Sequence, residues 1–102
     1  MEKFEEMIQS ETPVLVDYFA TWCGPCKMMH PILEDLKQRM GDGIKIVKID
    51  IDLPSNRANV EKHQIQSVPT LMLFQKGELL WRQSGVMRPT QLQEVIEKAT
   101  RS

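Results

Sequence analysis

Residues 14–26 read VLVDYFATWCGPC, and this stretch decides the fold. Its first part, residues 14–19, is an almost unbroken apolar run of strand length, which is typical of a strand buried on both faces of a sheet. From Gly24 to about Met40 the apolar residues recur at helical spacing and share one face. A buried strand that leads into an amphipathic helix predicts the start of a β-α-β unit with a right-handed crossover.

The rest of the chain also alternates between helical and strand patterns. We predict helices over residues 2–9, from 24 to about 40, from Ser55 or Asn56 to about His63, and from Pro89 onward, and strands over residues 14–19, 44–49, 70–74 and 79–84. The turn Lys76-Gly77-Glu78 joins the last two strands into a hairpin. A β-α-β unit followed by a hairpin predicts an α/β fold, with a mixed sheet of four strands and four helices on its two faces.

The composition is that of an ordinary globular protein. A chain of 102 residues, 41% hydrophobic and 26% charged, suits one domain over residues 1–102. A formal net charge of −1 without a basic run predicts neither nucleic acid nor an anionic membrane as a partner. The acidic residues 1–6 lack the basic and apolar segments of a secretory signal, so we expect a cytoplasmic protein, and we expect a monomer.

The two cysteines, Cys23 and Cys26, are the candidate reactive groups. Because they lie three positions apart at the start of a helix, their sulfurs can form a disulfide. Free backbone N–H groups at the helix N-terminus favour the thiolate of Cys23, and the thiolate is the nucleophile of thiol–disulfide exchange. We predict that Cys23 attacks a substrate disulfide, and that the deeper Cys26 then attacks Cys23 and releases the reduced substrate.

Two other uses of the cysteine pair are compatible with the sequence. A Cys-x-x-Cys pair also occurs in zinc sites, and His30 and His63 would complete a set of four ligands. Alternatively the cysteines are inert, and the fold is a binding module that docks to one partner. Because His63 is expected in a separate helix and Pro25 stiffens the loop, we predict no metal and no cofactor. We expect both histidines at the surface and the methionines, Met28 included, mostly in the core.

These features resemble the thioredoxin family. The run WCGPCK at residues 22–27 matches the family's active-site sequence, and Val68-Pro69-Thr70 resembles the segment that carries its cis-proline. Asp17 lies six residues before Cys23, as the buried acid of the family does. The resemblance extends from about Pro13 to the C-terminus. It implies the thioredoxin fold and a protein-disulfide reductase that acts on oxidised proteins and is recycled by a thioredoxin reductase.

The two residues between the cysteines, Gly24 and Pro25, resemble those of the family's reductants. Disulfide oxidases and isomerases of the same superfamily usually carry a histidine in that gap, where it stabilises the thiolate and makes the protein more oxidising. The resemblance therefore implies reduction, with an oxidase or isomerase as the alternative.

The resemblance also assigns roles to individual residues. Asp17 would accept the proton of Cys26, and Lys48 would pair with Asp17; otherwise Asp17 is a hydrogen-bonded carboxylate at a strand end and Lys48 a solvated strand residue. A cis bond before Pro69 would present the backbone of Val68 to an extended substrate segment. The implied contact surface consists of Trp22, Gly24, Pro25, Ile51, Val68, Pro69, Gly85 and Val86.

The chain departs from the family pattern at a few positions. Only twelve residues precede Pro13, so we expect the family's opening strand to be short or missing, which leaves four strands rather than five. Phe19 stands where many members have Trp, Gln64 where many have Gly, and Trp81 where a small or polar residue is common. None of these three positions takes part directly in the sulfur chemistry.

Overall fold

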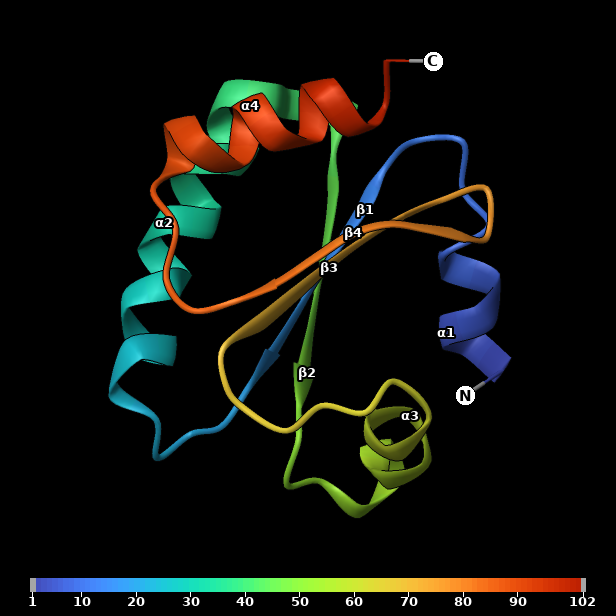
Figure 1. The fold of residues 1–102 in the computed structure, drawn as a ribbon, viewed down its shortest axis with the longest axis vertical. Helices are drawn as coiled ribbons and strands as arrows, with labels where there is room; N and C mark the ends of the chain where they lie inside the picture. The colour runs from blue at the N-terminus through green and yellow to red at the C-terminus, as the bar shows by residue number, and fades with distance from the viewer. Residues whose placement is uncertain (1, 102) are drawn as a thin grey trace.

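A computed structural model describes residues 2–101 of the chain. Figure 1 shows α2 and α4 on one side of the central sheet and α1 and α3 on the other. This arrangement confirms the predicted α/β fold. The elements are α1 (Glu2–Met7), β1 (Val14–Phe19), α2 (Gly24–Met40), β2 (Lys45–Asp50), α3 (Arg57–Lys62), β3 (Thr70–Gln75), β4 (Glu78–Ser84) and α4 (Pro89–Ala99).

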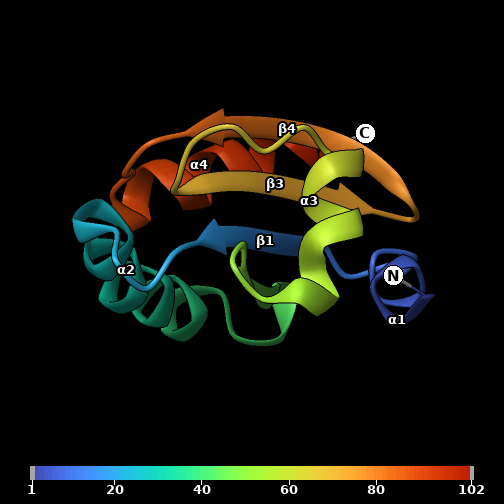
Figure 2. The same ribbon diagram turned by 90° about the horizontal axis from the view of Figure 1, so that it is seen from below.

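The sheet is mixed and has the strand order β2-β1-β3-β4. β1 and β2 run parallel, whereas β1 pairs with β3 and β3 with β4 in antiparallel fashion. Because a parallel pair needs a long crossover, α2 connects β1 to β2. Figure 2 shows β3 between β4 and β1. No strand precedes β1 in the described part of the chain, so β2 forms one edge of a four-stranded sheet, as predicted.

Two apolar cores lie on the two faces of the sheet, because successive side chains of a strand point to opposite faces. On one face Leu15 and Leu73 pack against α2 and α4. On the other face Val16 and Tyr18 pack against α1 and α3. β1 and β3 are therefore buried on both faces, which explains their continuous apolar sequences. The helix residues that complete the first core include Met29, Leu33, Leu36, Leu92 and Ile96.

Several details differ from the predictions at the ends of elements. The proposed side-chain cap of the third helix is wrong: residues 54–56 form a 3₁₀ turn, and Asn56 instead donates to the carbonyl of Asp50 at 2.9 Å. Met28 is 60% exposed rather than in the core, because the buried face of α2 passes through its neighbour Met29. Trp81, on β4, packs half-buried against the α2 and α4 core opposite Leu73.

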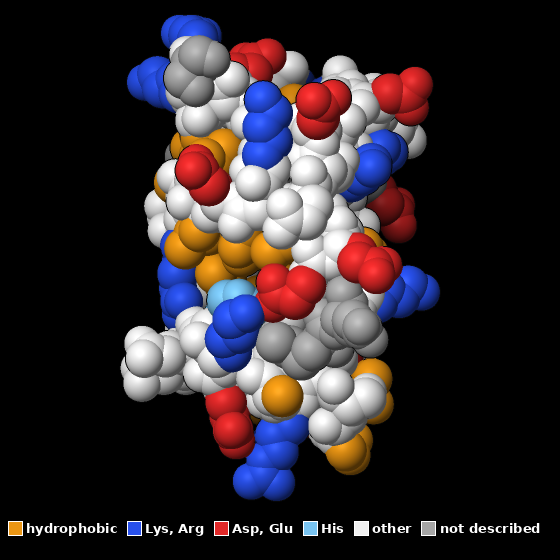
Figure 3. Space-filling view, turned by 90° about the vertical axis from the view of Figure 1, so that its right-hand side faces the viewer, with side chains coloured by type: hydrophobic (Ala, Val, Ile, Leu, Met, Phe, Trp, Pro, Cys, Tyr) orange, Lys and Arg blue, Asp and Glu red, His pale blue; other side chains and the backbone are white. Residues whose placement is uncertain are grey.

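The outer surface near α1 and α3 carries charges of both signs. Figure 3 shows Lys and Arg side chains interspersed with Asp and Glu on this side of the molecule, with a hydrophobic area between them. No helix among residues 2–101 is long and apolar enough to cross a membrane.

Candidate active site

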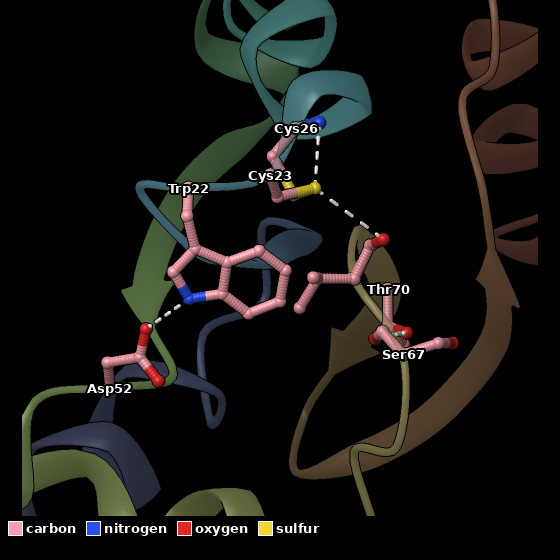
Figure 4. Close-up of a disulfide and its surroundings, with 7 residues drawn as sticks. Trp22, Cys23, Cys26, Asp52, Ser67 and Thr70 are labelled. Carbon is pink, nitrogen blue, oxygen red and sulfur yellow. Dashed lines mark hydrogen bonds between the residues drawn. A yellow bond between two sulfur atoms is a disulfide. The ribbon is translucent and has the colours of Figure 1, made fainter.

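Cys23 and Cys26 are joined by a disulfide at the N-terminal end of α2, with their Cα atoms 5.3 Å apart (Figure 4). Cys23 is the N-cap residue, and its Sγ accepts a hydrogen bond from the backbone N–H of Cys26 at 3.2 Å. Pro25 lies in the first turn, where its missing N–H costs little. Cys23 is 5% exposed and Cys26 is fully buried, so Cys26 is the deeper of the two, as predicted.

The loop before β3 lies against the disulfide. Cys23 Sγ is 3.7 Å from the carbonyl oxygen of Val68, and the bond between Val68 and Pro69 is cis, as the resemblance implied. The backbone N–H of Gly85 donates to the carbonyl of Pro69 at 2.9 Å. The Thr70 hydroxyl donates to the carbonyl of Ser67 at 2.7 Å. The loop is thereby fixed between the cysteines and the end of β4.

The predicted contact residues gather around the cysteines but differ in exposure. Ile51 and Val68 pack against the buried cluster that contains both sulfurs, and each keeps part of its side chain accessible. Trp22 is 69% exposed and Val86 39% exposed, so both can contact a substrate. Of the remaining members, Gly24 and Pro25 are exposed, Gly85 is half-exposed and Pro69 is buried.

A further member of this region, Asp52, was missed by the sequence reasoning. The indole N–H of Trp22 donates to Asp52 Oδ2 at 2.8 Å, and Figure 4 shows the indole nitrogen directed at this carboxylate. The backbone N–H of Asp52 donates to Asp50 Oδ1 at 3.0 Å, which orders the turn after β2. The sequence does contain an indication of this position. Asp52 follows β2, and because the carboxyl ends of parallel strands lie at the same edge of a sheet, Asp52 is expected near the cysteines that follow β1.

Asp17 is a buried carboxylate beneath the site. Its side chain is fully buried, and neither oxygen has a hydrogen-bond partner among residues 2–101. It shares a sheet face with Leu15, the face covered by α2, which carries Cys26. Burial raises the pKa of Asp17 to about 6, and the positive charge of Lys48 opposes that rise. A perturbed carboxyl group on the sheet face beneath the helix that carries Cys26 is a candidate for proton transfer.

Lys48 stands opposite Asp17 in the register of β1 and β2, but the direct pair implied by the resemblance is not formed. The Nζ of Lys48 instead lies 3.1 Å from Nδ1 of His30 on α2. Sequence reasoning assigned His30 only to the surface and to a possible zinc site. The contact between His30 and Lys48 depends on the rotamers of both side chains, which no local sequence pattern specifies.

The two histidines are half-buried rather than fully at the surface. The His30 ring packs edge-on against Phe19 on the α2 side of the sheet. The His63 ring packs against Phe4 on the opposite side, with ring centroids 5.4 Å apart. The four candidate zinc ligands are therefore not brought together. Among the described residues, no group of three or more His, Cys, Asp or Glu side chains is placed to bind a metal.

The chain is similar to known proteins over nearly its whole length. The thioredoxin family model matches residues 1–98. The chain is 46% identical over 89 residues to a thioredoxin of Bacillus subtilis, a match that covers 87% of this chain and 84% of that protein. It is 43% identical over 97 residues to the chloroplastic thioredoxin Y of Oryza sativa, a match that covers 94% of this chain but only 56% of the rice protein.

A solved structure extends the likeness to the fold. It comes from work on how a yeast mitochondrial 1-Cys peroxiredoxin is resolved through glutathione and thioredoxin systems. Its matched chain superimposes with a TM-score of 0.84 at 32% identity, covering 96% of this chain and 89% of that one. With the disulfide at the start of α2 and the family match over nearly its whole length, the chain belongs to the thioredoxin family of protein-disulfide oxidoreductases.

Proposed function

We propose that this chain reduces disulfides in other proteins, with Cys23 as the nucleophile and Cys26 as the resolving thiol. One observation carries the proposal: the two sulfurs differ in their environment. Cys23 Sγ sits at a helix N-cap and receives the Cys26 N–H, and Cys23 retains a small exposed fraction, whereas Cys26 is fully buried. The first sulfur is stabilised as a thiolate and accessible to a substrate, and the second is accessible only to the first.

The exchange proceeds in two balanced steps. The Cys23 thiolate attacks one sulfur of the substrate disulfide, the other substrate sulfur leaves as a thiolate, and a mixed disulfide forms. The Cys26 thiolate then attacks Cys23 Sγ and releases the remaining substrate sulfur as a thiolate. The substrate gains two electrons, and this chain acquires the Cys23–Cys26 disulfide, which is the state seen in the structure. A dithiol donor, for which we propose a thioredoxin reductase, restores both thiols.

We assign Asp17 as the base that receives the proton of Cys26 before the second step. A buried carboxyl group with a pKa raised to about 6 is partly protonated near neutral pH, which suits it for exchanging a proton in both directions. Lys48, as the cation that acts on Asp17, adjusts its basicity. No hydrogen bond from another described residue fixes the Asp17 oxygens, so the carboxyl group is free to exchange a proton.

We propose that substrates bind across the apolar surface around Cys23. The exposed side chains of Trp22 and Val86 would contact the substrate, and the backbone of Val68, adjacent to Cys23 Sγ, would pair with an extended segment of it. The remaining members of this surface are Gly24, Pro25, Ile51, Pro69 and Gly85. Oxidised proteins, for example peroxiredoxin-type thiol enzymes, are suitable substrates, since the yeast structure concerns such a partner.

We further propose that residues 1–102 act as a single, monomeric thioredoxin domain in the cytoplasm. The family match over residues 1–98 supports the domain, and the bacterial relative supports a reducing compartment. Size-exclusion chromatography with light scattering tests the monomer, and cell fractionation with an antibody tests the compartment. A dimer, or recovery in an oxidising compartment, would contradict these assignments.

The function itself is tested by reduction of insulin disulfides with dithiothreitol as the electron source. The wild type should accelerate the reaction, whereas Cys23→Ser and Cys26→Ser should both lose turnover. No acceleration by the wild type, together with retained binding to a partner, would favour the binding module. Equilibration with glutathione tests the direction of electron flow: a potential close to the −120 mV or so of strong oxidants would favour an oxidase.

A further inference from the structure

The ammonium group of Lys48 is bound by the imidazole of His30. Lys48 Nζ and His30 Nδ1 are 3.1 Å apart. Because an ammonium group has donors and no acceptor, Nδ1 must be the acceptor in this contact. The His30 ring also packs edge-on against Phe19, with centroids 5.5 Å apart and an interplanar angle of 80°. This packing limits the rotation of the ring and fixes the direction of the acceptor nitrogen.

The same ammonium group has a second available acceptor in Asp17. Lys48 and Asp17 are partners in the β1–β2 register, and Lys48 is the charged group that acts on the Asp17 carboxyl. The other neighbouring elements bring an apolar residue and a disulfide sulfur: Leu71 lies opposite Asp17 on β3, and α2 carries Cys26. Around Lys48, α2 also presents the charged side chains of Glu34 and Lys37. Both Asp17 oxygens nevertheless lack a hydrogen-bond partner in the described part of the chain. The lysine therefore contacts the histidine and makes no hydrogen bond to the carboxylate.

We propose that His30 is a positioning residue for disulfide exchange, which binds the Lys48 ammonium and so keeps Asp17 free of a direct ion pair. The inference rests on the proposed role of Asp17 as the base for Cys26. An opposite charge in direct contact lowers the pKa of an aspartate by roughly 1–3 units and weakens it as a base. By binding Lys48, His30 preserves the basicity that burial gives to Asp17.

A ¹³C NMR titration of the aspartate side-chain carboxyl groups in the oxidised protein tests this directly. The Asp17 signal is identified by its loss in Asp17→Asn. The wild type should titrate with a pKa of about 6. In His30→Ala the freed lysine should turn toward Asp17 and lower this pKa by roughly half a unit or more. His30→Asn keeps a side-chain acceptor near the position of Nδ1 without the ring, and it should stay close to the wild-type value.

A double-mutant cycle with Lys48→Met separates positioning from simple packing. If His30 acts through Lys48, His30→Ala should leave the Asp17 pKa unchanged in the Lys48→Met background. An equal shift with and without the lysine would overturn the proposal, as would identical titrations of wild type and His30→Ala. A His30→Asn protein that behaves like His30→Ala would also overturn it, because the effect would then belong to the ring rather than to the acceptor.

The same variants give a kinetic readout that distinguishes this inference from the proposed role of Asp17. The rate at which Cys26 resolves a preformed mixed disulfide on Cys23 is measured by stopped flow across pH. His30→Ala should move the midpoint of this profile to lower pH by the amount seen in the NMR titration. If Asp17→Asn leaves the profile unchanged, the role of Asp17 fails. If the NMR pKa is unaffected by His30→Ala, the role of His30 fails independently.

Discussion

The backbone N–H of Cys26 donates a hydrogen bond to the Sγ of Cys23 across 3.2 Å. The donor is one of the free N–H groups at the start of α2, so it and the helix dipole act on the same sulfur. No described residue donates a hydrogen bond to the Cys26 sulfur, which is fully buried one turn into the helix. After reduction, the two thiols should therefore differ in both thiolate content and access to reagents.

Alkylation of the reduced protein measures this difference. With limiting iodoacetamide near neutral pH, we expect Cys23 to react at least about tenfold faster than Cys26, because thiolate content and exposure favour the same residue. Peptide mapping by mass spectrometry at short reaction times gives the ratio, and denatured protein, in which the two should react similarly, is the control. Equal labelling of both cysteines in the folded protein would contradict their separate roles.

Asp17→Asn should stabilise the oxidised protein at high pH and not at low pH. Burial raises the pKa of Asp17 from 3.8 to about 6, so folding favours the protonated form. Well below the unfolded-state pKa of 3.8 the carboxyl group is neutral in both states and costs nothing, whereas above the folded-state pKa of about 6 the folded state must keep a buried carboxylate, at a cost of about 2–3 kcal/mol. Asparagine avoids this cost because it does not ionise.

Denaturant unfolding of the wild type and Asp17→Asn at pH 8 and pH 3.5 checks this prediction. The difference in free energy of unfolding should approach the full amount at pH 8 and fall close to zero at pH 3.5. A difference that is the same at both pH values would show that the substitution acts through packing rather than through the charge.

Asp52→Ala should weaken substrate binding while leaving the fold intact. The Asp52 carboxylate accepts the indole N–H of Trp22 at 2.8 Å, and without it the 69% exposed indole is free to rotate. Loss of one hydrogen bond of about 0.5–1.5 kcal/mol predicts a fall of roughly two- to tenfold in kcat/KM for insulin. Asp52→Asn retains an acceptor and should stay near the wild type; if it instead matches Asp52→Ala, the charge and not the hydrogen bond is responsible.

Gln64→Gly should stabilise the protein. Gln64 follows α3 with a φ of +52°, a left-handed conformation that costs a residue with a Cβ roughly 1–2 kcal/mol. Arg82 donates to the backbone carbonyl of Gln64 at 2.9 Å, a bond that glycine retains. After the entropy cost of glycine we expect a net gain of about 0.5–1 kcal/mol in thermal or denaturant unfolding.

The matched control for this substitution is Gln66→Gly. Gln66 is also exposed and lies two residues away, but its φ is not positive, so glycine there should cost stability. If both glycine substitutions destabilise to the same extent, the left-handed backbone of Gln64 carries no strain of consequence.

The sequence predicts the fold and the cysteine pair because both depend on local patterns. The continuous apolar run of β1 and the helical spacing of α2 each reflect one repeating geometry, and the two cysteines lie within one helical turn. Met28 and Met29 show the limit of this reasoning, since both are apolar neighbours on α2 and only the placement of the core decides which one is buried.

The long-range polar contacts of the site could not be predicted from the sequence. Trp22 reaches Asp52, thirty positions away, and Lys48 turns to His30 rather than to Asp17. Each contact depends on side-chain rotamers and on the packing of α2 against the sheet, which neither periodicity nor residue spacing encodes. The resemblance to the family predicted that Asp17 and Lys48 lie in one region, but it did not predict that Lys48 contacts His30.

Trapping of the mixed disulfide tests the central assignment of Cys23 and Cys26 most directly. Cys26→Ser is mixed with insulin and the products are separated on a non-reducing gel, with the linked residue mapped by mass spectrometry. We predict a stable adduct through Cys23, its release by dithiothreitol, and no adduct with Cys23→Ser/Cys26→Ser. Failure of Cys26→Ser to form an adduct through Cys23, or an adduct of equal yield through Cys26 in Cys23→Ser, would contradict the assignment.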